Sequence, residues 1–362
     1  MTPKTIFDAP TPCLVLDRAK LRRNIQRMAE SCQRKGVKLR PHLKTAKSID
    51  VAHLVLEGQD SMIAVSTLRE AEYFAENGVR DIQYAACITP DKLERVTKIQ
   101  STGAKVILIT DSIEVARAIA GKAGEIDTLF HVQIEIDCGE RRSGIYPDSG
   151  ALIEIANILN DAPNVAFAGI MSHAGHSYNC RSLGEIEIVA ENERHAAVTA
   201  AERVRALGIA CDTVSVGSTP TALHARHLEG VTETRPGVYM FGDMFQAQIN
   251  SCTVDDLAVS VLADVSCHRP DLQRMLIDAG ALALSKDRST ENVRNDIGFG
   301  LVGNARGWKM EPQMKVSRVF QEHGVLELGA DYALEDFPIG TRLRIYPNHV
   351  CMTAAMYDCY HV

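Results

Sequence analysis

One lysine in the stretch "RPHLKTAK" (residues 40–47) stands where an amine could carry out chemistry. The stretch follows a short apolar run, "GVKL", and contains Lys44 and Lys47 beside an arginine and a histidine. A lysine amine attacks carbonyl compounds when its surroundings favour the neutral form. A solvated charged turn is the ordinary alternative for such a basic cluster. The sequence therefore offers Lys44, which directly follows a predicted strand, as a candidate nucleophile.

A candidate anion site lies in "VGSTPTALH" (residues 216–224). A glycine is followed by Ser218 and Thr219, and the proline after them can begin a helix. Backbone N–H groups at the start of a helix, together with two hydroxyls, suit a phosphate group. The segment "RPG" (residues 235–237) is next along the chain. A plain helix cap remains the alternative interpretation.

A candidate metal site is the pair His349 and Cys351 in "YPNHVCMT", after a predicted strand. In extended backbone, residues two apart project to the same face, so we expect the two side chains to be neighbours. Imidazole and thiolate are good ligands for zinc or a similar divalent ion. Two protein ligands leave positions open for water and substrate. The alternative is a core cysteine beside a surface histidine.

The segment "GFGLVG" (residues 298–303) matches the glycine pattern of dinucleotide-binding loops. That fingerprint requires a strand before it and a helix after it. Neither "ENVRND" nor "NARGW", which flank the segment, has such a pattern. We therefore expect a loop here and no dinucleotide site.

Short apolar runs alternate with amphipathic segments from about residue 12 to residue 245. Several amphipathic segments open on Asp, Ser or Thr and close on Gly, as helices do. The predicted strands are residues 37–42, 61–66, 81–87, 105–110, 130–137, 165–173, 212–217 and 237–242. Eight strands alternating with helices predict an α/β fold, a (β/α)8 barrel of the TIM type. A doubly wound sheet would also fit the alternation.

The residues that follow barrel strands meet at one end of a barrel, where catalytic groups belong. Polar and basic residues follow the first, fifth and sixth predicted strands, namely Lys44, Arg141, Arg142, His173, His176 and Tyr178. The segments containing Ser218 and Arg235 flank the last two strands. The barrel interpretation thus brings the candidate residues to one end.

The pattern changes after about residue 250, where strand-like segments are separated by turns with little helix. This pattern predicts a second, mostly β domain. We expect a barrel at residues 12–248 and a C-terminal β domain at residues 249–362, which residues 1–11 join.

The composition is that of a soluble globular protein, with 362 residues of which 46% are hydrophobic and 23% are charged. The net charge of −7 gives no general attraction to nucleic acid or anionic membrane. The sequence contains no membrane span and no signal-peptide pattern at its start. Its ten cysteines are dispersed without a C-x-x-C pair. We therefore expect reduced thiols and a cytoplasmic protein.

Taken in order, "RPHLKTAK", "ERRSG", "SVGSTPT", "RPGVY" and "PNHVC" resemble the fold-type III pyridoxal phosphate enzymes. More narrowly, the chain resembles the metal-activated D-serine dehydratase and D-threonine aldolase family, which shares the alanine racemase barrel. The resemblance covers nearly the whole chain. Each motif is weak alone, whereas the ordered set is specific.

The resemblance implies roles for individual residues. Lys44 would bind pyridoxal 5'-phosphate covalently and then act as a base toward the substrate. Contacts with the cofactor would come from Arg142, His173, Tyr178, Ser218, Thr219, Arg235, Gly237 and Val238. His349 and Cys351 would bind zinc, or manganese, cobalt or magnesium. His323 in "QEHG" would lie near the metal, and it and Tyr178 are candidate catalytic residues. Related enzymes pair two chains, which implies a homodimer.

The "HVC" motif favours the dehydratase branch, because the aldolases of this family carry His-x-Asp at that position. The implied reaction is β-elimination from a D-β-hydroxy amino acid, such as D-serine, D-threonine or D-threo-3-hydroxyaspartate, giving a 2-oxo acid and ammonia. A retro-aldol reaction would use the same cofactor and metal and remains the main alternative. Racemisation has no use for a metal pair, and a non-enzymatic pyridoxal-phosphate-binding protein would lack the second domain. For a second substrate carboxylate, the candidate partner is Arg141 or a basic residue elsewhere.

Overall fold

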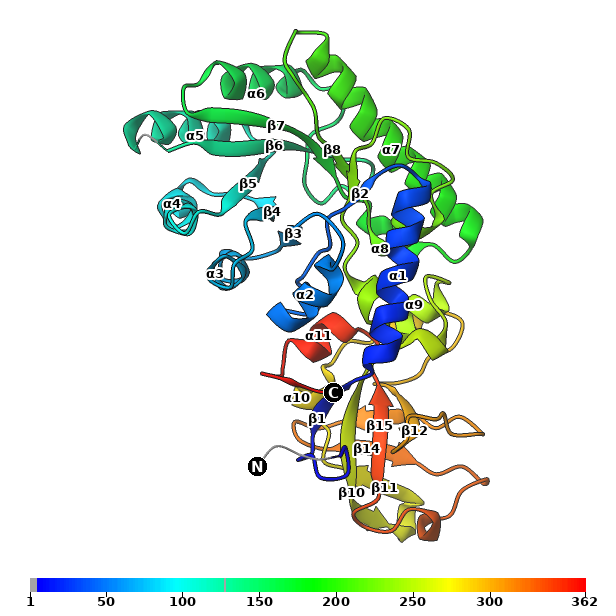
Figure 1. Cartoon of the computed structure of the whole chain (residues 1–362). Helices are drawn as coiled ribbons and strands as arrows, with labels where there is room; N and C mark the ends of the chain where they lie inside the picture. Colours follow the sequence, from blue (N-terminus) through cyan, green and yellow to red (C-terminus); the bar gives the residue numbers. More distant parts are fainter. Residues whose placement is uncertain (1–4, 127) are drawn as a thin grey trace. The chain divides into compact units, whose positions relative to one another are not determined.

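The computed structural model describes residues 5–126 and 128–362, and the chain forms two compact units. One unit comprises Arg27–Gly237. The other comprises Met1–Gln26 together with Val238–Val362, so the blue start and the yellow-to-red end of the chain in Figure 1 belong to the same unit.

The first unit is built on a parallel sheet of eight strands. The order β2-β9-β8-β7-β6-β5-β4-β3 places almost every strand beside the next one in the chain. A parallel bridge between His42 and Ala64 joins the two ends of the sheet, as barrel closure requires. The strands are Lys38–Leu39 (β2), Met62–Val65 (β3), Asp81–Cys87 (β4), Lys105–Thr110 (β5), Phe130–Ile136 (β6), Val165–Ser172 (β7), Val214–Val216 (β8) and Glu233–Thr234 (β9).

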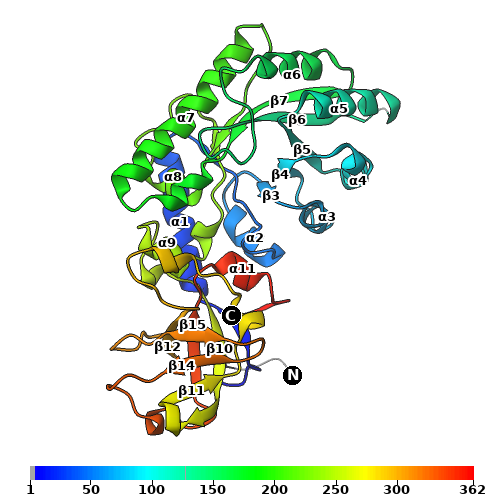
Figure 2. The same cartoon turned by 180° about the vertical axis from the view of Figure 1, so that it is seen from behind.

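Helices follow the strands and lie outside them (Figures 1 and 2). They are Ile49–Leu56 (α2), Leu68–Glu76 (α3), Leu93–Gln100 (α4), Ile113–Ile126 (α5), Gly150–Asp161 (α6), Leu183–Arg205 (α7) and Thr219–His224 (α8). Arg18–Arg34 (α1) precedes β2, and its residues are divided between the two units after Gln26. Ser182 caps α7 through a reciprocal hydrogen-bond pair with Glu185, as a capping box does. None of the helices in the described ranges is long and apolar enough to cross a membrane. The parallel sheet with helices outside it confirms the predicted α/β barrel.

The eighth barrel strand is not the predicted one. Residues 237–242 were expected to form it, but the strand is β9, Glu233–Thr234, and Val238–Met240 form a 3-10 helix. The amide of Gly242 donates to the carbonyl of Val238 at 2.8 Å, which closes a turn instead of a ladder. The apolar side chains of this segment are buried. A short run of apolar residues does not by itself distinguish a strand from a helix.

The second unit is mostly antiparallel sheet in the order β12-β15-β10-β11-β14-β13. Its strands are Cys13–Leu16 (β1), Val259–Arg269 (β10), Arg274–Ile277 (β11), Leu301–Asn304 (β12), Val316–Val319 (β13), Gly324–Glu327 (β14), Arg342–Tyr346 (β15) and Tyr360–His361 (β16). Three short helices accompany them, Met244–Gln248 (α9), Ala281–Leu284 (α10) and Val350–Ala354 (α11). A mostly β second domain is confirmed.

The start of the chain contributes to this β unit. Strand β1 pairs antiparallel with β10, from Cys13 opposite Leu262 to Leu16 opposite Val259. Of residues 1–11, which were expected to join this domain, residues 1–4 lie outside the described ranges. In the segment "GFGLVG", expected to be a loop, residues 298–300 form a turn with φ angles of 61° at Gly298 and 153° at Gly300, whereas residues 301–303 belong to β12. It has no dinucleotide-binding context.

Gly169 in β7 generates a prediction about the barrel. Its φ angle is 107°, and an added Cβ would lie 2.1 Å from the carbonyl oxygen of Thr213. Gly169→Ala should therefore cost about 3 kcal/mol through backbone strain and overlap. Gly36→Ala is the matched control, because Gly36 also has positive φ (69°) but has nothing within 4 Å. It should cost only about 1 kcal/mol.

Calorimetric melting temperatures of the two variants and the parent measure the difference. The Gly169 variant should melt well below the Gly36 variant. Equal melting temperatures would show that the β7 backbone does not approach Thr213 as described.

Candidate active site

A cavity of about 250 Å³ lies in the barrel unit and is lined by residues at or just after the carboxyl ends of several strands. Four of the candidate residues line it, namely Lys44, Arg142, His173 and Arg235. Glu135 and Cys87, which the sequence did not single out, line it as well. The carboxyl ends of the barrel strands therefore do bring together residues that lie far apart in the sequence.

The two lysines of the opening stretch have different surroundings. Lys47 has a φ angle of 49°, and its Nζ lies 2.8 Å from Oε1 of Glu70. Lys44 is exposed and lines the cavity, and its backbone amide donates to Nδ1 of His42. Lys44 is thus the lysine whose amine can meet a ligand in the cavity.

The cavity is electrostatically positive. Burial, and then the charges of Arg235, Arg142 and Lys44, lower the pKa of His173 to about 3. Burial, and then Lys44 and Arg235, likewise lower the pKa of His42 well below its usual value. Both imidazoles are therefore neutral at neutral pH, so the formal positive charges belong to the lysine and the arginines. Such a cavity suits an anionic ligand.

Arg235 is the deepest of these cations, with only 4% of its surface exposed. Its guanidinium donates to the carbonyl of Ser172 and to the hydroxyl of Ser215. Burial lowers the pKa of Arg235, although Glu233 and other carboxylates oppose this effect. These contacts fix the guanidinium within the barrel.

Arg142 and Arg141 separate in the structure. Arg142 lines the cavity, and its Nη1 lies 3.4 Å from Oε1 of Glu140. Arg141 has a φ angle of 60°, and its amide donates to Oδ1 of Asp137 at 3.1 Å. Arg141 is not among the residues that line the cavity. Of the two, Arg142 is therefore better placed to meet a ligand.

The loops after β7 and β8 form a second part of the site. The hydroxyls of Ser177 and Ser218 lie 2.8 Å apart, and Ser218 caps α8. Thr219 is buried, and Tyr178 is half-buried in the 3-10 helix Gly175–Asn179. The two loops thus bring hydroxyl groups close together, from Ser177 on one loop and from Ser218 and Thr219 on the other.

Close backbone approaches leave no room for side chains in this region. At Gly237 an added Cβ would lie 2.7 Å from the carbonyl oxygen of His42, and at Gly217 it would lie 2.0 Å from Oγ1 of Thr234. Among the described residues, Oγ1 of Thr234 is buried and has no hydrogen-bond partner. A cavity-lining lysine, buried hydroxyls and tight glycines are compatible with an anionic cofactor such as pyridoxal phosphate. Val238 is the first residue of the segment that belongs to the β unit, and it is buried.

The candidate metal pair lies in the β unit, with a backbone that differs from the prediction. His349 is extended and precedes α11, whereas Cys351 is helical, so the pair is not in a continuous extended segment. The side chains are nevertheless neighbours and hydrogen-bond with each other. Nδ1 of His349 lies 3.1 Å from Oδ2 of Asp287. This leaves Nε2 as the nitrogen that can bind a metal. A carboxylate that hydrogen-bonds the other nitrogen of a metal-binding histidine orients the imidazole ring.

The charges around this pair are coupled. Burial acts to lower the pKa of His349, but hydrogen bonds with Asp287 and Cys351 outweigh it and raise the pKa to about 11. Burial acts to raise the pKa of Asp287, but hydrogen bonds from His349 and Ser289 bring it down to about 2. Asp287 is thus a carboxylate that stabilises a positive charge at His349. A divalent ion bound to the imidazole would likewise place positive charge beside the Asp287 carboxylate.

Asp243 anchors the metal-pair segment from behind. Its Oδ1 accepts from the amide of Gln246 at 2.7 Å, and its Oδ2 accepts from the amide of Val350 at 3.1 Å. Burial raises the pKa of Asp243 to about 6. Neither Asp243 nor Asp287 has a local motif around it, which is why the sequence did not reveal them.

His323 lies in an exposed turn between β13 and β14. Its carbonyl accepts from the amide of Phe320 at 2.8 Å. In the described part of the chain, no group of three metal-ligand atoms within 4.8 Å of one another includes His323, His349 or Cys351. The catalytic role of His323 stays a prediction.

One group of three potential ligands does occur, in the barrel unit. Atoms of Cys87, Asp111 and Glu135 lie within 4.8 Å of one another. Burial raises the pKa of Cys87, and Glu135 and Asp111 raise it further, so the thiol is protonated. The thiol donates to Oε2 of Glu135 at 3.1 Å. The three residues come from the ends of different strands, so no spacing in the sequence could have indicated the group.

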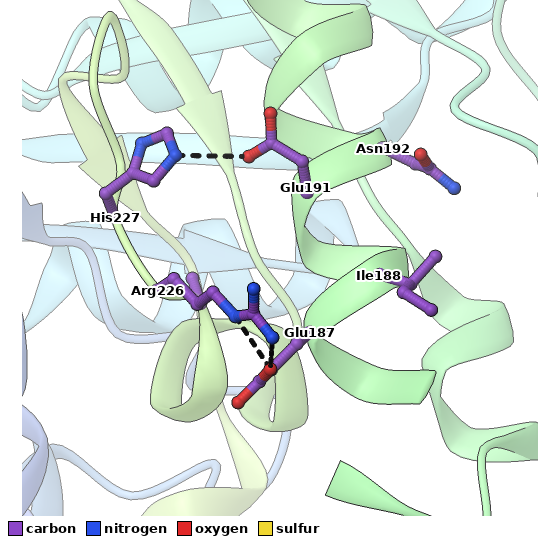
Figure 3. A pocket seen from close by; sticks show the side chains of 7 residues that line it. Glu187, Ile188, Glu191, Asn192, Arg226 and His227 are labelled. Atoms are coloured by element: carbon purple, nitrogen blue, oxygen red, sulfur yellow. Dashed lines mark hydrogen bonds and ion pairs between the residues drawn. The ribbon is translucent and has the colours of Figure 1, made fainter. Parts of the chain in front are cut away.

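Another cavity, of about 290 Å³, lies on the barrel unit between α7 and the segment after α8. Figure 3 shows Arg226 directed toward Glu187 and His227 toward Glu191. The charged groups that line this cavity are paired with one another, and none of the candidate residues lines the cavity. We therefore place the candidate active site elsewhere.

Comparison with known proteins identifies the class of enzyme. Residues 16–244 match the alanine racemase N-terminal domain, and residues 258–362 match a putative serine dehydratase domain. The chain therefore belongs to the alanine racemase-like family, in the group that carries the serine dehydratase domain. This confirms the resemblance inferred from the motifs.

One named enzyme is similar to this chain along nearly its whole length. The chain is 42% identical to D-threo-3-hydroxyaspartate dehydratase from Delftia sp. (strain HT23), covering 98% of this chain and 94% of the relative. The solved structure of that enzyme has a TM-score of 0.95, covering 98% of this chain and 95% of that chain at 42% identity. A solved cysteine-to-alanine variant of D-threo-3-hydroxyaspartate dehydratase, described as metal-free, has the same TM-score of 0.95.

Two other relatives have different names. D-serine dehydratase from Dictyostelium discoideum is 33% identical, covering 97% of this chain and 93% of the relative. The structure of D-threonine aldolase from Filomicrobium marinum has a TM-score of 0.83 at 25% identity, covering 98% of this chain and 91% of that chain. Dehydratases and aldolases of this kind are lyases.

The contact between Asp287 and His349 generates a prediction. Asp287→Asn should lower the affinity for a divalent metal by about 10–100-fold, because an amide no longer favours the orientation and basicity of the imidazole. Asp271→Asn is the control, because Asp271 pairs with Arg269 on the surface of the same unit. Metal content after dialysis against buffered zinc measures the effect. Equal zinc affinity in the parent and both variants would remove Asp287 from the metal site.

Proposed function

We propose that this protein is a lyase that uses pyridoxal 5'-phosphate and a divalent metal to dehydrate D-β-hydroxy amino acids. The products would be a 2-oxo acid and ammonia. The observation that carries the proposal is the combination, in one chain, of Lys44 in a cationic cavity with a carboxylate-supported His-x-Cys pair. The likeness to a named D-threo-3-hydroxyaspartate dehydratase over 98% of the chain supports it.

The residues of the barrel unit would hold the cofactor. Lys44 would bind its aldehyde, and Arg142 would contact the phenolic oxygen. Arg235 would face the ring, and His173 and Tyr178 would lie against it. The phosphate would meet a set of hydroxyls and backbone groups from Ser218, Thr219, Gly237 and Val238. When bound, pyridoxal phosphate supplies an electron sink that stabilises negative charge on the substrate α-carbon.

The protein's own groups would move the proton and orient the leaving group. The freed amine of Lys44 would take the proton from the α-carbon, and the pair of electrons left behind would form the double bond as the β-hydroxyl departs. His349 and Cys351 would hold a metal that acts as a Lewis acid on that hydroxyl. Asp287 would keep the imidazole of His349 oriented. Hydrolysis of the released enamine then gives the 2-oxo acid and ammonia.

Among the possible substrates, we favour D-threo-3-hydroxyaspartate. It carries a second carboxylate, which needs a cation, whereas D-serine and D-threonine do not. Arg141, a candidate from the sequence, does not line the cavity, and the cations that do line it are Lys44, Arg142 and Arg235. The similarity to a dehydratase named for this substrate supports the same choice.

The retro-aldol reaction is the second candidate, because the same lysine and metal would serve it. The relative named D-threonine aldolase shares the fold at a TM-score of 0.83. We favour dehydration because this chain carries His-x-Cys, which the resemblance associates with dehydratases. Two relatives named dehydratases, at 42% and 33% identity, are also more similar to it than D-threonine aldolase from Arthrobacter sp, at 28%. The serine dehydratase domain at residues 258–362 counts against a purely cofactor-binding role.

We further propose a homodimer in the cytoplasm. The resemblance supports pairing of two chains. The ten cysteines, all within the described residues, form no disulfide with one another, which is compatible with a reducing compartment. Zinc is the metal that we favour, because an imidazole and a thiol are preferred zinc ligands.

Borohydride reduction tests the assignment of the lysine. The protein with bound cofactor should absorb near the edge of the visible range, and borohydride should fix the cofactor on Lys44. Lys47 is an internal control in the same peptide region, because it pairs with Glu70. Peptide mapping by mass spectrometry locates the adduct. An adduct on Lys47, or none, would exclude Lys44 as the attachment site.

Chelation separates the roles of metal and cofactor. Treatment with a chelator should abolish turnover of D-β-hydroxy amino acids and leave the cofactor absorbance in place, because the two would be held by different residues. Cys351→Ala should act like the chelator, whereas Cys267→Ala, at an exposed cysteine, should have no effect. Full turnover in a metal-free sample would remove His349 and Cys351 from the reaction.

A further inference from the structure

Glu193 is a buried carboxylate to which neither the sequence nor the proposed mechanism gives a role. It lies on α7, on the outer layer of the barrel, and only 1% of its surface is exposed. A carboxylate in such a position requires hydrogen-bond partners, because an unpartnered buried charge is costly. Its partners therefore indicate what it holds in place.

Those partners belong to two different loops. Oε1 of Glu193 accepts from the amide of Ala174 at 2.8 Å and from the amide of Gly217 at 2.9 Å. Ala174 follows β7 and leads into the segment with Tyr178, and Gly217 follows β8 and directly precedes Ser218. A single carboxylate oxygen thus ties together the loops that carry several candidate cofactor contacts.

A chain of hydroxyl groups extends the connection. The side chain of Thr221 hydrogen-bonds with Glu193, and Oγ1 of Thr221 lies 3.1 Å from Oγ of Ser218. Oγ1 of Thr221 also accepts from the amide of Ser218 at 2.9 Å. Ser218 in turn contacts the hydroxyl of Ser177 at 2.8 Å. The direction of the Ser218 hydroxyl is therefore coupled to Glu193 through one intermediate residue.

The shape of the Gly217 loop depends on this anchor. Gly217 has a φ angle of 108°, which disfavours side chains. It also packs so closely on β9 that an added Cβ would lie 2.0 Å from Oγ1 of Thr234. A loop with this backbone needs a fixed acceptor for its amide, and Glu193 provides it.

We infer that Glu193 is a positioning residue for the phosphate of the cofactor: it holds the loops after β7 and β8 in the arrangement that presents the Ser218 and Thr219 hydroxyls. The inference rests on the proposed use of pyridoxal 5'-phosphate. It assigns Glu193 no contact with substrate or cofactor. The role requires an acceptor oxygen and not a negative charge, since both amides bond to one oxygen and burial raises the pKa of the carboxyl.

Comparison of two cofactor forms isolates this role. Apoprotein is titrated with pyridoxal 5'-phosphate and with pyridoxal, which lacks the phosphate, and binding is followed by absorbance. The variants are Glu193→Ala, which removes the acceptor, and Glu193→Gln, whose Oε1 can accept both amides and whose amide can donate to Thr221. Glu202→Ala is the control, because Glu202 is exposed on the same helix.

Glu193→Ala should weaken pyridoxal phosphate binding at least tenfold and change pyridoxal binding less than twofold. Glu193→Gln and Glu202→Ala should keep the parental ratio of the two affinities. A merely structural role would weaken both ligands together. Equal weakening of both ligands by the alanine variant, or a loss in the glutamine variant as large as in the alanine variant, would overturn the inference.

Thr221→Val keeps the test decisive if Glu193→Ala fails to fold. Valine matches threonine in shape but removes the hydroxyl between Glu193 and Ser218. It should also weaken pyridoxal phosphate selectively, and an unchanged affinity ratio in this variant would contradict the coupling. If the parent protein binds neither ligand, the proposed cofactor itself is wrong, and that result is distinct from failure of the Glu193 inference.

Discussion

The buried ion pair between Arg40 and Glu233 is the interaction on which the barrel end depends. The two groups lie 2.9 Å apart with side-chain exposures of 4% and 5%, and they join β2 to β9, the first and last strands of the barrel. Glu233 also accepts from Ser215 on β8. Arg40 also pairs with Asp81, so loss of Glu233 would leave it one carboxylate partner. Loss of Arg40 would leave the Glu233 carboxylate buried without its ion-pair partner, which costs about 3–5 kcal/mol. The strand ends that position Lys44 and Arg235 therefore share one buried electrostatic network.

The two units use charge in opposite ways. In the barrel, Lys44 and the arginines make a positive cavity, and neighbouring histidines are neutral because burial and those cations lower their pKa. In the β unit, Asp287 stabilises positive charge at His349. An anionic cofactor suits the first arrangement, and a divalent cation suits the second. The proposed lyase chemistry requires both, one to stabilise the carbanion and the other to assist the leaving hydroxyl.

Much of this fold could be predicted from local patterns. Strands at residues 81–87 and 105–110 match the structure residue for residue because each is a bounded run of buried strand-forming residues. Residues 237–242 are apolar and buried but do not form a strand, because a short apolar run fits a buried helical turn as well as a strand. The spacing of His349 and Cys351 predicted neighbouring side chains, which the structure has, although the backbone becomes helical at Cys351. What the sequence could not show are the carboxylates Asp287 and Glu193, because their partners are distant in the chain and only the folded structure brings them together.

The products formed from D-threo-3-hydroxyaspartate by the metal-loaded protein with bound cofactor distinguish the proposed dehydration from its alternatives. Oxaloacetate and ammonia should appear in equal amounts, with no glycine and no glyoxylate. D-Serine and D-threonine, assayed in parallel, should yield their 2-oxo acids and ammonia if they react. Glycine with glyoxylate would contradict the account and identify an aldolase. Failure to convert any of the three amino acids would contradict it altogether.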